Sequence, residues 1–277
     1  MEFNWLNSIL MGILTGAASV LPVSVEAHQR LLLKFMGMRE IPVLTALAIH
    51  LGIAAALYVC CLNHILKMTR ASRLARIPKR KRKRPLDTRS LMDLSLLKTM
   101  LLPVILVFFL YEEVSGLVSN FIVMAAFLFV NGLLLYIPQF LPTSNKDCRT
   151  LSRVEGLLMG LGGGLFVVPG LSGVGAALSG ASVCGVERKY GLEMVLLMNL
   201  GLTAGRIVLD VWKLISVGGV FSIPGLLFCV LGALCAFAAT YGCVKFMRHL
   251  AGETGFAFFA YYSWGMALFT FILSLMA

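Results

Sequence analysis

Charged residues are scarce in this chain: Asp, Glu, Lys and Arg make up 13% of its 277 residues, whereas hydrophobic residues make up 59%. A mean hydropathy of +0.89 means more apolar surface than a soluble domain of this length buries in a core. The shortage of charge therefore excludes a single soluble globular domain. The composition predicts an all-α polytopic membrane protein.

Cysteine and histidine patterns typical of disulfide frameworks and zinc sites are also missing. The seven cysteines include no CxxC and no Cys/His metal spacing, and most lie in or beside apolar stretches, where they pack as small apolar residues. Of the four histidines, only His28 is placed for chemistry. No Lys or Arg precedes Arg30, so the basic start of a secretory signal peptide is absent.

Long apolar stretches account for most of the chain. A helix needs roughly 20 apolar residues to cross a bilayer, and eight stretches approach or exceed that length. Two of them are interrupted, so the sequence predicts about six full spans and two broken ones. The stretches lie near residues 4–33 (interrupted), 42–66, 96–116, 120–141, 151–182 (interrupted), 191–216, 221–246 and 256–277.

The two interrupted stretches share one pattern of glycine, proline and serine. The first has glycines at 12 and 16 and then Leu-Pro-Val-Ser at 21–24, and the second has glycines at 160 and 164 and then Val-Pro-Gly-Leu-Ser at 168–172. Breaking a helix in hydrocarbon costs several kcal/mol unless the break lies in protein or lines a wet cavity. Two matched breaks therefore predict one polar pocket at membrane depth.

Alignment of the two breaks indicates an internal repeat. Placing Pro22 on Pro169 brings the two glycine pairs together, which predicts one membrane domain, 1–277, with halves 1–145 and 146–277. The small-xxx-small glycine spacing also predicts close helix contacts just before each break. Glycine and proline are common in membrane helices, so a chance coincidence is the alternative.

Basic residues concentrate in one short segment. The net charge is +11, and residues 67–89 hold eleven of the 24 Lys and Arg against the single acid Asp87. This bias predicts that the loop lies on the cytoplasmic side and contacts anionic lipid headgroups. A nucleic-acid arm is the alternative, but the run lacks interleaved aromatics and is tethered between spans, so we expect no nucleic-acid partner. The weaker basic bias of 142–153 assigns no side.

Other polar residues have a simpler interpretation. Asn199, Thr203, Arg206 and Asp210 share one helix face, and Arg206 is expected to neutralise Asp210 four residues later. A site on this face is the alternative. The segment 111–113 is expected to mark a span end, and residues 187–189 an exposed connection.

Several motifs together carry a family resemblance. The segment 12–28 with its Leu-Pro-Val-Ser and His28, then Ile-His-Leu-Gly at 49–52, Pro-Gly-Leu-Ser-Gly-Val-Gly at 169–175 and Gly-Val-Glu-Arg at 185–188 resemble the bacterial undecaprenyl-diphosphate phosphatase family associated with bacitracin resistance. Their order and spacing match along nearly the whole chain.

The resemblance implies a fold, a reaction and a place in the cell. The fold has six membrane spans and two re-entrant broken-helix hairpins in an inverted repeat. The family removes a phosphate from a polyprenyl diphosphate lipid, which regenerates the carrier for cell-wall synthesis at the bacterial cytoplasmic membrane. Its site combines two glutamates, a serine, a histidine and an arginine, and a divalent cation, Mg²⁺ or Ca²⁺, assists.

This chain departs from the family at the charged positions. Thr15 and Ser19 stand where the family has its glutamates, Gly173 stands where it has its arginine, and Tyr262 is followed by Ser263 rather than by arginine. Charge stabilisation supplies much of the rate of such a reaction, and losing one donor typically costs 10²- to 10³-fold. The sequence therefore predicts weak or altered catalysis, with the usual carboxylate ligands of the metal absent.

The retained motif residues are the candidate site. Ser24 and His28 are predicted to be catalytic, as nucleophile and as base or acid, by the resemblance. Phosphate binding is expected at Ser24, Gly170, Ser172 and Gly173 through N–H groups at the two helix starts; alternatively, the serines only cap their helices.

Glu26 and Arg30 are possible substitutes for the lost charges. A carboxylate can orient an imidazole and a guanidinium can clamp a phosphate. The alternative is that the two sit at the water interface, solvated or paired with each other.

Three functions stay open on the sequence alone. The first is a phosphatase that acts on a polyprenyl diphosphate, the second a non-catalytic polyprenyl-phosphate binder or flippase, and the third a regulatory membrane scaffold. The missing charges favour the second function over the first. The oligomeric state and the identity of any metal are not determined by the sequence.

Overall fold

The computed structural model describes residues 4–111, 114, 120–142, 145–217, 223–252 and 256–276. Within these ranges the chain is helical and contains no strand, only an isolated bridge between Lys146 and Val186. The helices are α1 (Trp5–Ala18), α2 (Val25–Phe35), α3 (Val43–Ala75), α4 (Thr88–Phe108), α6 (Phe121–Tyr136), α7 (Arg153–Gly164), α8 (Gly173–Val183), α9 (Arg188–Val217), α10 (Ile223–Gly252) and α11 (Phe258–Leu275), with short 3₁₀ turns η1 (Lys79–Lys81), η2 (Ile137–Phe140) and η3 (Leu165–Val167).

Among the residues that the structure describes, six helices are long and apolar enough to cross a membrane: α3, α4, α6 with η2, α9, α10 and α11. This confirms the predicted all-α polytopic class and the number of full spans. The boundaries of α4 differ from the apolar stretch at 96–116, because the helix begins at Thr88. Its start is set by Asp87, whose carboxylate accepts the backbone N–H of Ser90 at 3.1 Å and so caps the helix.

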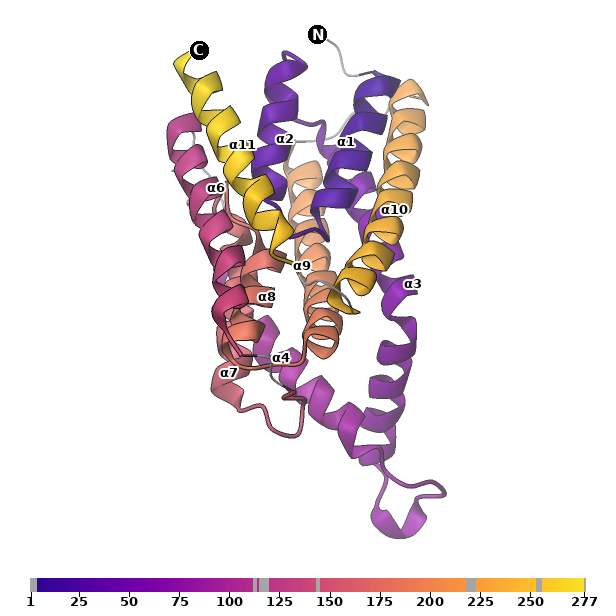
Figure 1. Cartoon of the computed structure of the whole chain (residues 1–277). Coiled ribbons are helices and arrows are strands. Elements are labelled where there is room, and N and C mark those ends of the chain that lie inside the picture. The colour runs from indigo at the N-terminus through magenta and orange to yellow at the C-terminus, as the bar shows by residue number, and fades with distance from the viewer. Residues whose placement is uncertain are drawn as a thin grey trace.

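The two interrupted stretches form the helix pairs α1–α2 and α7–α8. Figure 1 shows α1 and α2 at the end of the bundle that holds both chain termini, and α7 and α8 toward the opposite end, with the two breaks meeting in the middle. The hairpins therefore enter the bundle from opposite ends. Division of the chain into repeat halves near residue 145 stays a prediction.

A serine starts the second helix of each hairpin. Ser24 Oγ accepts the N–H of Ala27 at 3.3 Å and caps α2, and Ser172 Oγ accepts the N–H of Gly175 at 3.0 Å and caps α8. Gly170 in the second break has φ +110°, a conformation that L side chains rarely adopt. Both breaks are thus encoded locally, by a proline, a capping serine and, in the second, a glycine.

Close packing of α1 and α7 depends on their glycines. A Cβ on Gly16 would lie 2.5 Å from the carbonyl oxygen of Ala236 on α10, and one on Gly160 would meet the carbonyl of Met100 on α4. The predicted close contacts of the small-xxx-small pattern are confirmed. They hold each hairpin against a full span, so the positions of the breaks are fixed by backbone-to-backbone contact.

The course of the chain places two basic connections toward one end. The connection that follows α3 lies at the end of the molecule opposite the termini, and α7 begins toward the same end (Figure 1). Residues 145–153, part of the loop to which the sequence assigned no side, therefore lie toward the same end as the basic run 79–84. Within the basic loop, the Arg82 side chain donates to the carbonyl of Ile77 at 2.7 Å and that of Ala75 at 3.1 Å.

Candidate functional site

The two breaks touch each other directly. The backbone N–H of Gly170, in the second break, donates to Ser24 Oγ, in the first, at 3.0 Å. Ser24 is fully buried, and its hydroxyl oxygen therefore accepts two N–H groups, one from its own helix and one from the other hairpin. The serine is at once a helix cap and a tie between the hairpins.

A buried asparagine on α6 strengthens this contact. The Asn131 side-chain oxygen accepts the N–H of Ser172 at 2.9 Å, while its amide donates to Ser263 Oγ on α11 at 2.9 Å and approaches the carbonyl of Pro22 at 3.4 Å. One side chain thus joins both breaks to a third element. Because a buried amide in an apolar helix is costly unless all its groups are paired, this arrangement determines how the breaks meet.

A small cavity of about 40 Å³ lies beside the joined breaks. Residues of both hairpins and of α3 and α9 line it, and its polar lining consists of Thr15, Ser19, His50, Ser172, Asn199, Thr203 and Arg206. The volume is that of a few water molecules at most. The cavity lies where the matched breaks predicted a pocket, between the two hairpins, but its lining combines these polar groups with a larger apolar surface.

Three of the four positions that lack the family's charges line this cavity, the exception being Ser263. Thr15, Ser19 and Gly173 are among its lining residues, so the replacements fall inside the pocket. The Thr15 hydroxyl accepts a hydrogen bond from the Gln29 amide at 2.9 Å, and the Ser19 hydroxyl donates to the carbonyl of Gly16 at 2.8 Å. Neutral hydrogen bonds therefore occupy the places where the resemblance implies carboxylates.

Gly173 is tightly enclosed. A Cβ at this position would lie 2.5 Å from the carbonyl oxygen of Gly163 on α7 and 2.9 Å from Cβ of Phe166. No side chain fits there without movement of the backbone. The close packing of α7 on α8 therefore leaves no room for the arginine that the family has at this position.

A buried carboxylate and guanidinium meet at the edge of the cavity. Arg206 on α9 donates to Glu26 Oε1 on α2 at 2.8 Å, and the Tyr111 hydroxyl donates to the same oxygen at 2.6 Å. The guanidinium also lies over the rings of Tyr111 and Phe166, 5.1 and 5.0 Å from their centroids. Glu26 and Arg206 are both largely buried, so each stabilises the other's charge away from water.

This pairing corrects two expectations from the sequence. Arg206 was expected to neutralise Asp210, but Asp210 pairs with His50 Nδ1 on α3 at 2.5 Å. Each of the two α9 side chains is closer to a partner on a neighbouring helix than to the other. Glu26 was expected, as the alternative to a site role, to be solvated or paired with Arg30; it is 8% exposed and bound by Arg206. Arg30 is half-buried and is not among the residues lining the cavity.

His28 is held by the backbone and by α11. Its Nδ1 lies 2.6 Å from the Ser24 carbonyl oxygen and its Nε2 2.7 Å from the Tyr262 hydroxyl. Since a carbonyl only accepts, Nδ1 carries a proton; in a neutral ring Nε2 then accepts from the tyrosine hydroxyl. The ring also stacks on Tyr262 at 5.7 Å between centroids.

Ser24 and His28 are adjacent but do not form a nucleophile–base pair. The imidazole bonds the Ser24 carbonyl, whereas the hydroxyl accepts the two N–H groups of Ala27 and Gly170. Of the predicted phosphate-binding residues, Ser172 and Gly173 line the cavity, while the Gly170 N–H is taken by Ser24. Ser24 and His28 are therefore held in structural hydrogen bonds, and neither is among the residues that line the cavity.

Helix starts supply the cavity's remaining polar groups. Val25 begins α2, and Gly173 and Val174 begin α8; all three line the cavity. The first N–H groups of a helix have no acceptor within it, and the helix dipole adds partial positive charge there. Two helix starts and one guanidinium therefore make the cavity suited to an anion.

The residues present do not fit a divalent cation bound in the family manner. Thr15 and Ser19 offer hydroxyls in place of carboxylates, and Glu26 Oε1 is occupied by Arg206 and Tyr111. Among the described residues, no group of three or more His, Cys, Asp or Glu side chains could hold a metal ion. No step that depends on a metal follows from this site.

Some site residues were not singled out in the sequence. Asn131 was overlooked although a lone asparagine in the apolar run 121–136 is a signal by itself, since buried amides in membrane helices need partners. His50 was set aside as a scattered histidine, and Tyr111 was assigned to a span end. Of that predicted span end, Glu112 and Glu113 lie outside the described residues.

Comparison with known proteins agrees with this geometry. Residues 8–269 match the family model described as bacitracin resistance protein BacA. The chain is 28% identical to an undecaprenyl-diphosphatase of Methanobrevibacter smithii over 96% of both chains. It is 24% identical to one of Carboxydothermus hydrogenoformans over 94% of both, and 27% identical to one of Parvibaculum lavamentivorans over 94% of this chain and 92% of the relative. The chain therefore belongs to the BacA family of bacitracin resistance proteins.

Proposed function

We propose that this membrane protein holds the phosphate of a polyprenyl diphosphate or monophosphate carrier lipid at the joined breaks, and hydrolyses the diphosphate slowly. The family and its named relatives support the lipid class. The slow hydrolysis is inferred from one observation: Thr15, Ser19 and Gly173, three of the four positions without the family's charges, line the same cavity.

Arg206 is the proposed substitute for the lost arginine. It lines the cavity, and it lies on α9 rather than on the second break. An arginine can bind phosphate oxygens bidentately. Its present bond to Glu26 must loosen for it to do so, which lowers the affinity for the lipid phosphate.

Entry of the headgroup requires the cavity to widen. A volume of about 40 Å³ is well below the roughly 300 Å³ of the smallest usual ligand pockets. The two hairpins are held together by the Ser24–Gly170 and Asn131–Ser172 hydrogen bonds. Widening therefore separates these contacts, and the N–H groups they release become available to the phosphate.

The test is a paired assay on the purified chain in nanodiscs. We expect phosphate release from the C55 diphosphate to be at least about 10²-fold slower than for a family member with both glutamates and the arginine, while lipid binding is retained and is weakened by Arg206→Gln. Lys146→Gln, which removes a cation of the exposed Lys146–Glu155 pair, serves as the control. Fast, metal-dependent turnover that His28→Ala abolishes would contradict the proposal.

A second candidate is a carrier that binds or flips a polyprenyl phosphate without hydrolysis. Two broken hairpins that enter from opposite ends and meet at mid-depth are typical of transporters. In the same nanodiscs this function predicts binding with no phosphate release at any metal concentration. Detectable release that Arg206→Gln lowers in parallel with binding would favour the phosphatase instead.

We also propose that the end with the basic run 79–84 faces the cytoplasm and contacts anionic lipids. Positive residues of both 67–89 and 146–153 lie at this end, as expected for cytoplasmic connections. A cysteine introduced at Lys81 should be labelled by a membrane-impermeant maleimide only after the cells are opened. Labelling of intact cells would reverse the orientation.

A further inference from the structure

A second and larger cavity lies away from the joined breaks. Its volume is about 250 Å³, and it opens between η2, the end of α8, the start of α9, and residues 256–257 just before α11. The η2 turn and the start of α9 lie in the half of the bundle that is nearer the basic run 79–84 (Figure 1). α8 separates this cavity from the joined breaks: Ser172 caps one end of the helix, and Ser182 lies ten residues on, about 15 Å at 1.5 Å per residue.

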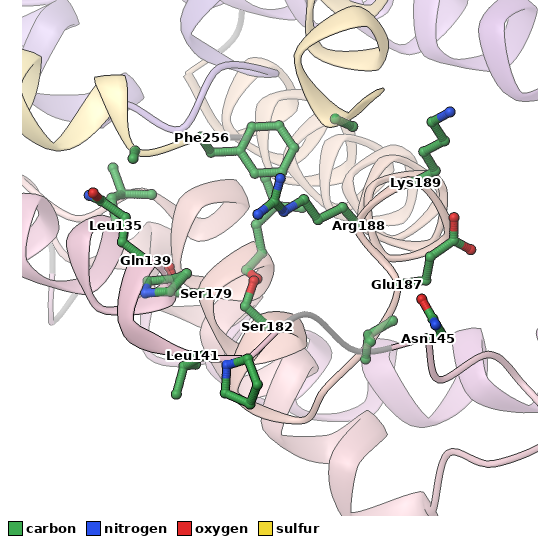
Figure 2. A pocket seen from close by; sticks show the side chains of 16 residues that line it. Leu135, Gln139, Leu141, Asn145, Ser179, Ser182, Glu187, Arg188, Lys189 and Phe256 are labelled. Carbon is green, nitrogen blue, oxygen red and sulfur yellow. The ribbon is translucent and has the colours of Figure 1, made fainter. Parts of the chain in front are cut away.

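Arg188 faces into this cavity. Figure 2 shows its guanidinium between Phe256 and the two serines of α8, while the side chains of Glu187 and Lys189 lie to one side. In the part of the chain that the structure describes, the Arg188 side chain makes no ion pair or hydrogen bond. An exposed guanidinium directed into a cavity is well placed to bind an anion from solution.

A buried hydroxyl in the cavity wall also lacks a partner. Ser179 is 6% exposed and lines the cavity, and among the described residues its Oγ is the buried side-chain oxygen without a hydrogen bond. Ser182, one turn on, bonds the Leu178 carbonyl at 3.0 Å. An unsatisfied buried hydroxyl costs free energy, so a ligand oxygen that accepts from Ser179 would remove that cost.

The start of α9 adds positive potential to the same place. Arg188 is the first residue of this 30-residue helix, whose first N–H groups have no acceptor within it. Among the described residues, the charged side chains that line the cavity are Arg188, Lys189 and Glu187, two cations and one anion. The amides of Gln139 and Asn145 complete the polar lining.

We propose that this cavity binds a phosphate group, with Arg188 as the main anchor and Ser179 as a hydrogen-bond donor. The phosphate belongs either to inorganic phosphate or to the headgroup of a phosphomonoester lipid, since both present the same oxygens. The site is separate from the cavity at the joined breaks and does not depend on the function proposed for it.

The test uses the full chain in neutral phosphatidylcholine nanodiscs. In one arm, equilibrium dialysis measures binding of radiolabelled inorganic phosphate; in the other, native mass spectrometry measures retention of phosphatidic acid added to the nanodiscs. We expect saturable binding in at least one arm. Arg188→Gln should weaken it about tenfold or more, Arg188→Lys should retain part of it, and Ser179→Ala should weaken it a few-fold.

The control is Arg149→Gln, which removes the same charge from the same end at an exposed residue outside the cavity. Binding should be unchanged in this variant. Equal losses for Arg188→Gln and Arg149→Gln would mean diffuse attraction to a basic surface and would overturn the site, as would the absence of saturable binding in both arms. Lipid held only at the joined breaks would not respond to Arg188→Gln, so that outcome rejects this site and leaves the function of the breaks untouched.

Discussion

The two breaks share their proline and serine, but the helices that come after them differ in charge. After the first break, α2 carries Glu26, His28, Arg30 and Lys34 within eleven residues; after the second, α8 carries no charged residue and reads Gly-Val-Gly-Ala-Ala-Leu-Ser-Gly-Ala-Ser-Val. The first hairpin reaches out to Arg206 and Tyr262 through polar contacts. The second packs by close approach of small residues.

The family resemblance implies that both breaks carry charged residues as well as helix-start N–H groups; here the helix after the second break keeps only the N–H groups. In this chain, charge is concentrated on the first hairpin and on α9, and the second hairpin contributes helix-start N–H groups and shape. A site can therefore lose its charges at their usual positions and still keep the backbone arrangement around them. Substitutions in each hairpin and on α9 test that separation.

The largest effect is expected at the buried ion pair. Arg206→Met leaves the Glu26 carboxylate buried without its cation, which should cost about 3–5 kcal/mol of unfolding free energy. Denaturant unfolding in detergent micelles measures it. The double variant with Glu26→Gln should lose less than the sum of the single losses. A loss as small as that of Lys146→Met, in the exposed Lys146–Glu155 pair, would show that the buried pair contributes little.

The two capping serines should differ in the same assay. Ser24→Ala removes the acceptor of two buried N–H groups, those of Ala27 and Gly170, and should cost roughly 2–4 kcal/mol. Ser172→Ala removes the acceptor of one, that of Gly175, and should cost about 1 kcal/mol. Equal losses would mean that the hydrogen bond from Gly170 N–H to Ser24 Oγ adds no stability beyond that of the helix cap.

Close packing of the second hairpin predicts a smaller but specific loss. Gly173→Ala places a Cβ against the Gly163 carbonyl and should cost about 1–3 kcal/mol. The matched control is Gly242→Ala, in α10, where an added Cβ meets nothing within 4 Å and alanine is favoured by up to about 1 kcal/mol. Gly173→Arg, the family residue, should lower stability rather than restore hydrolysis, and a folded, faster enzyme would refute the packing argument.

The smallest effect concerns how each hairpin begins. Asn4 caps α1 without a charge, whereas α7 has a capping box of Ser152 and Glu155 with Lys146 at 2.7 Å. The hydrogen bond from Lys146, with that from the Ser152 backbone, lowers the pKa of Glu155 to about 2. A lowered pKa stabilises the folded state above the unfolded pKa of about 4.3, and the gain is lost as pH falls toward 2.

Because Lys146 and Glu155 are partly exposed, the gain should be under about 1 kcal/mol. Stability measured between pH 7 and pH 2 should therefore fall slightly more for the natural chain than for Glu155→Gln. Identical pH profiles of the two proteins would mean that the Lys146–Glu155 ion pair does not stabilise the start of α7.

Much of the fold could be predicted because its signals are local. Spans, breaks and helix caps depend on residues within one or two turns of each other, so hydropathy, proline and serine spacing indicate them. The glycine pairs of α1 and α7 indicated close contact for the same reason, although not the helix that each would meet. The start of α4 was missed because a capping aspartate, not hydropathy, determines it.

The sequence by itself determined the membrane class, the six spans, the two breaks with their capping serines, and the neutral residues where the family carries charge. Only the tertiary structure decided that Arg206 binds Glu26 rather than Asp210, that His28 bonds Tyr262 and not the Ser24 hydroxyl, and that Gly173 has no room for a side chain. The physical reason is distance along the chain: Glu26 and Arg206 are 180 residues apart, and which of several buried charges meet depends on how the helices pack.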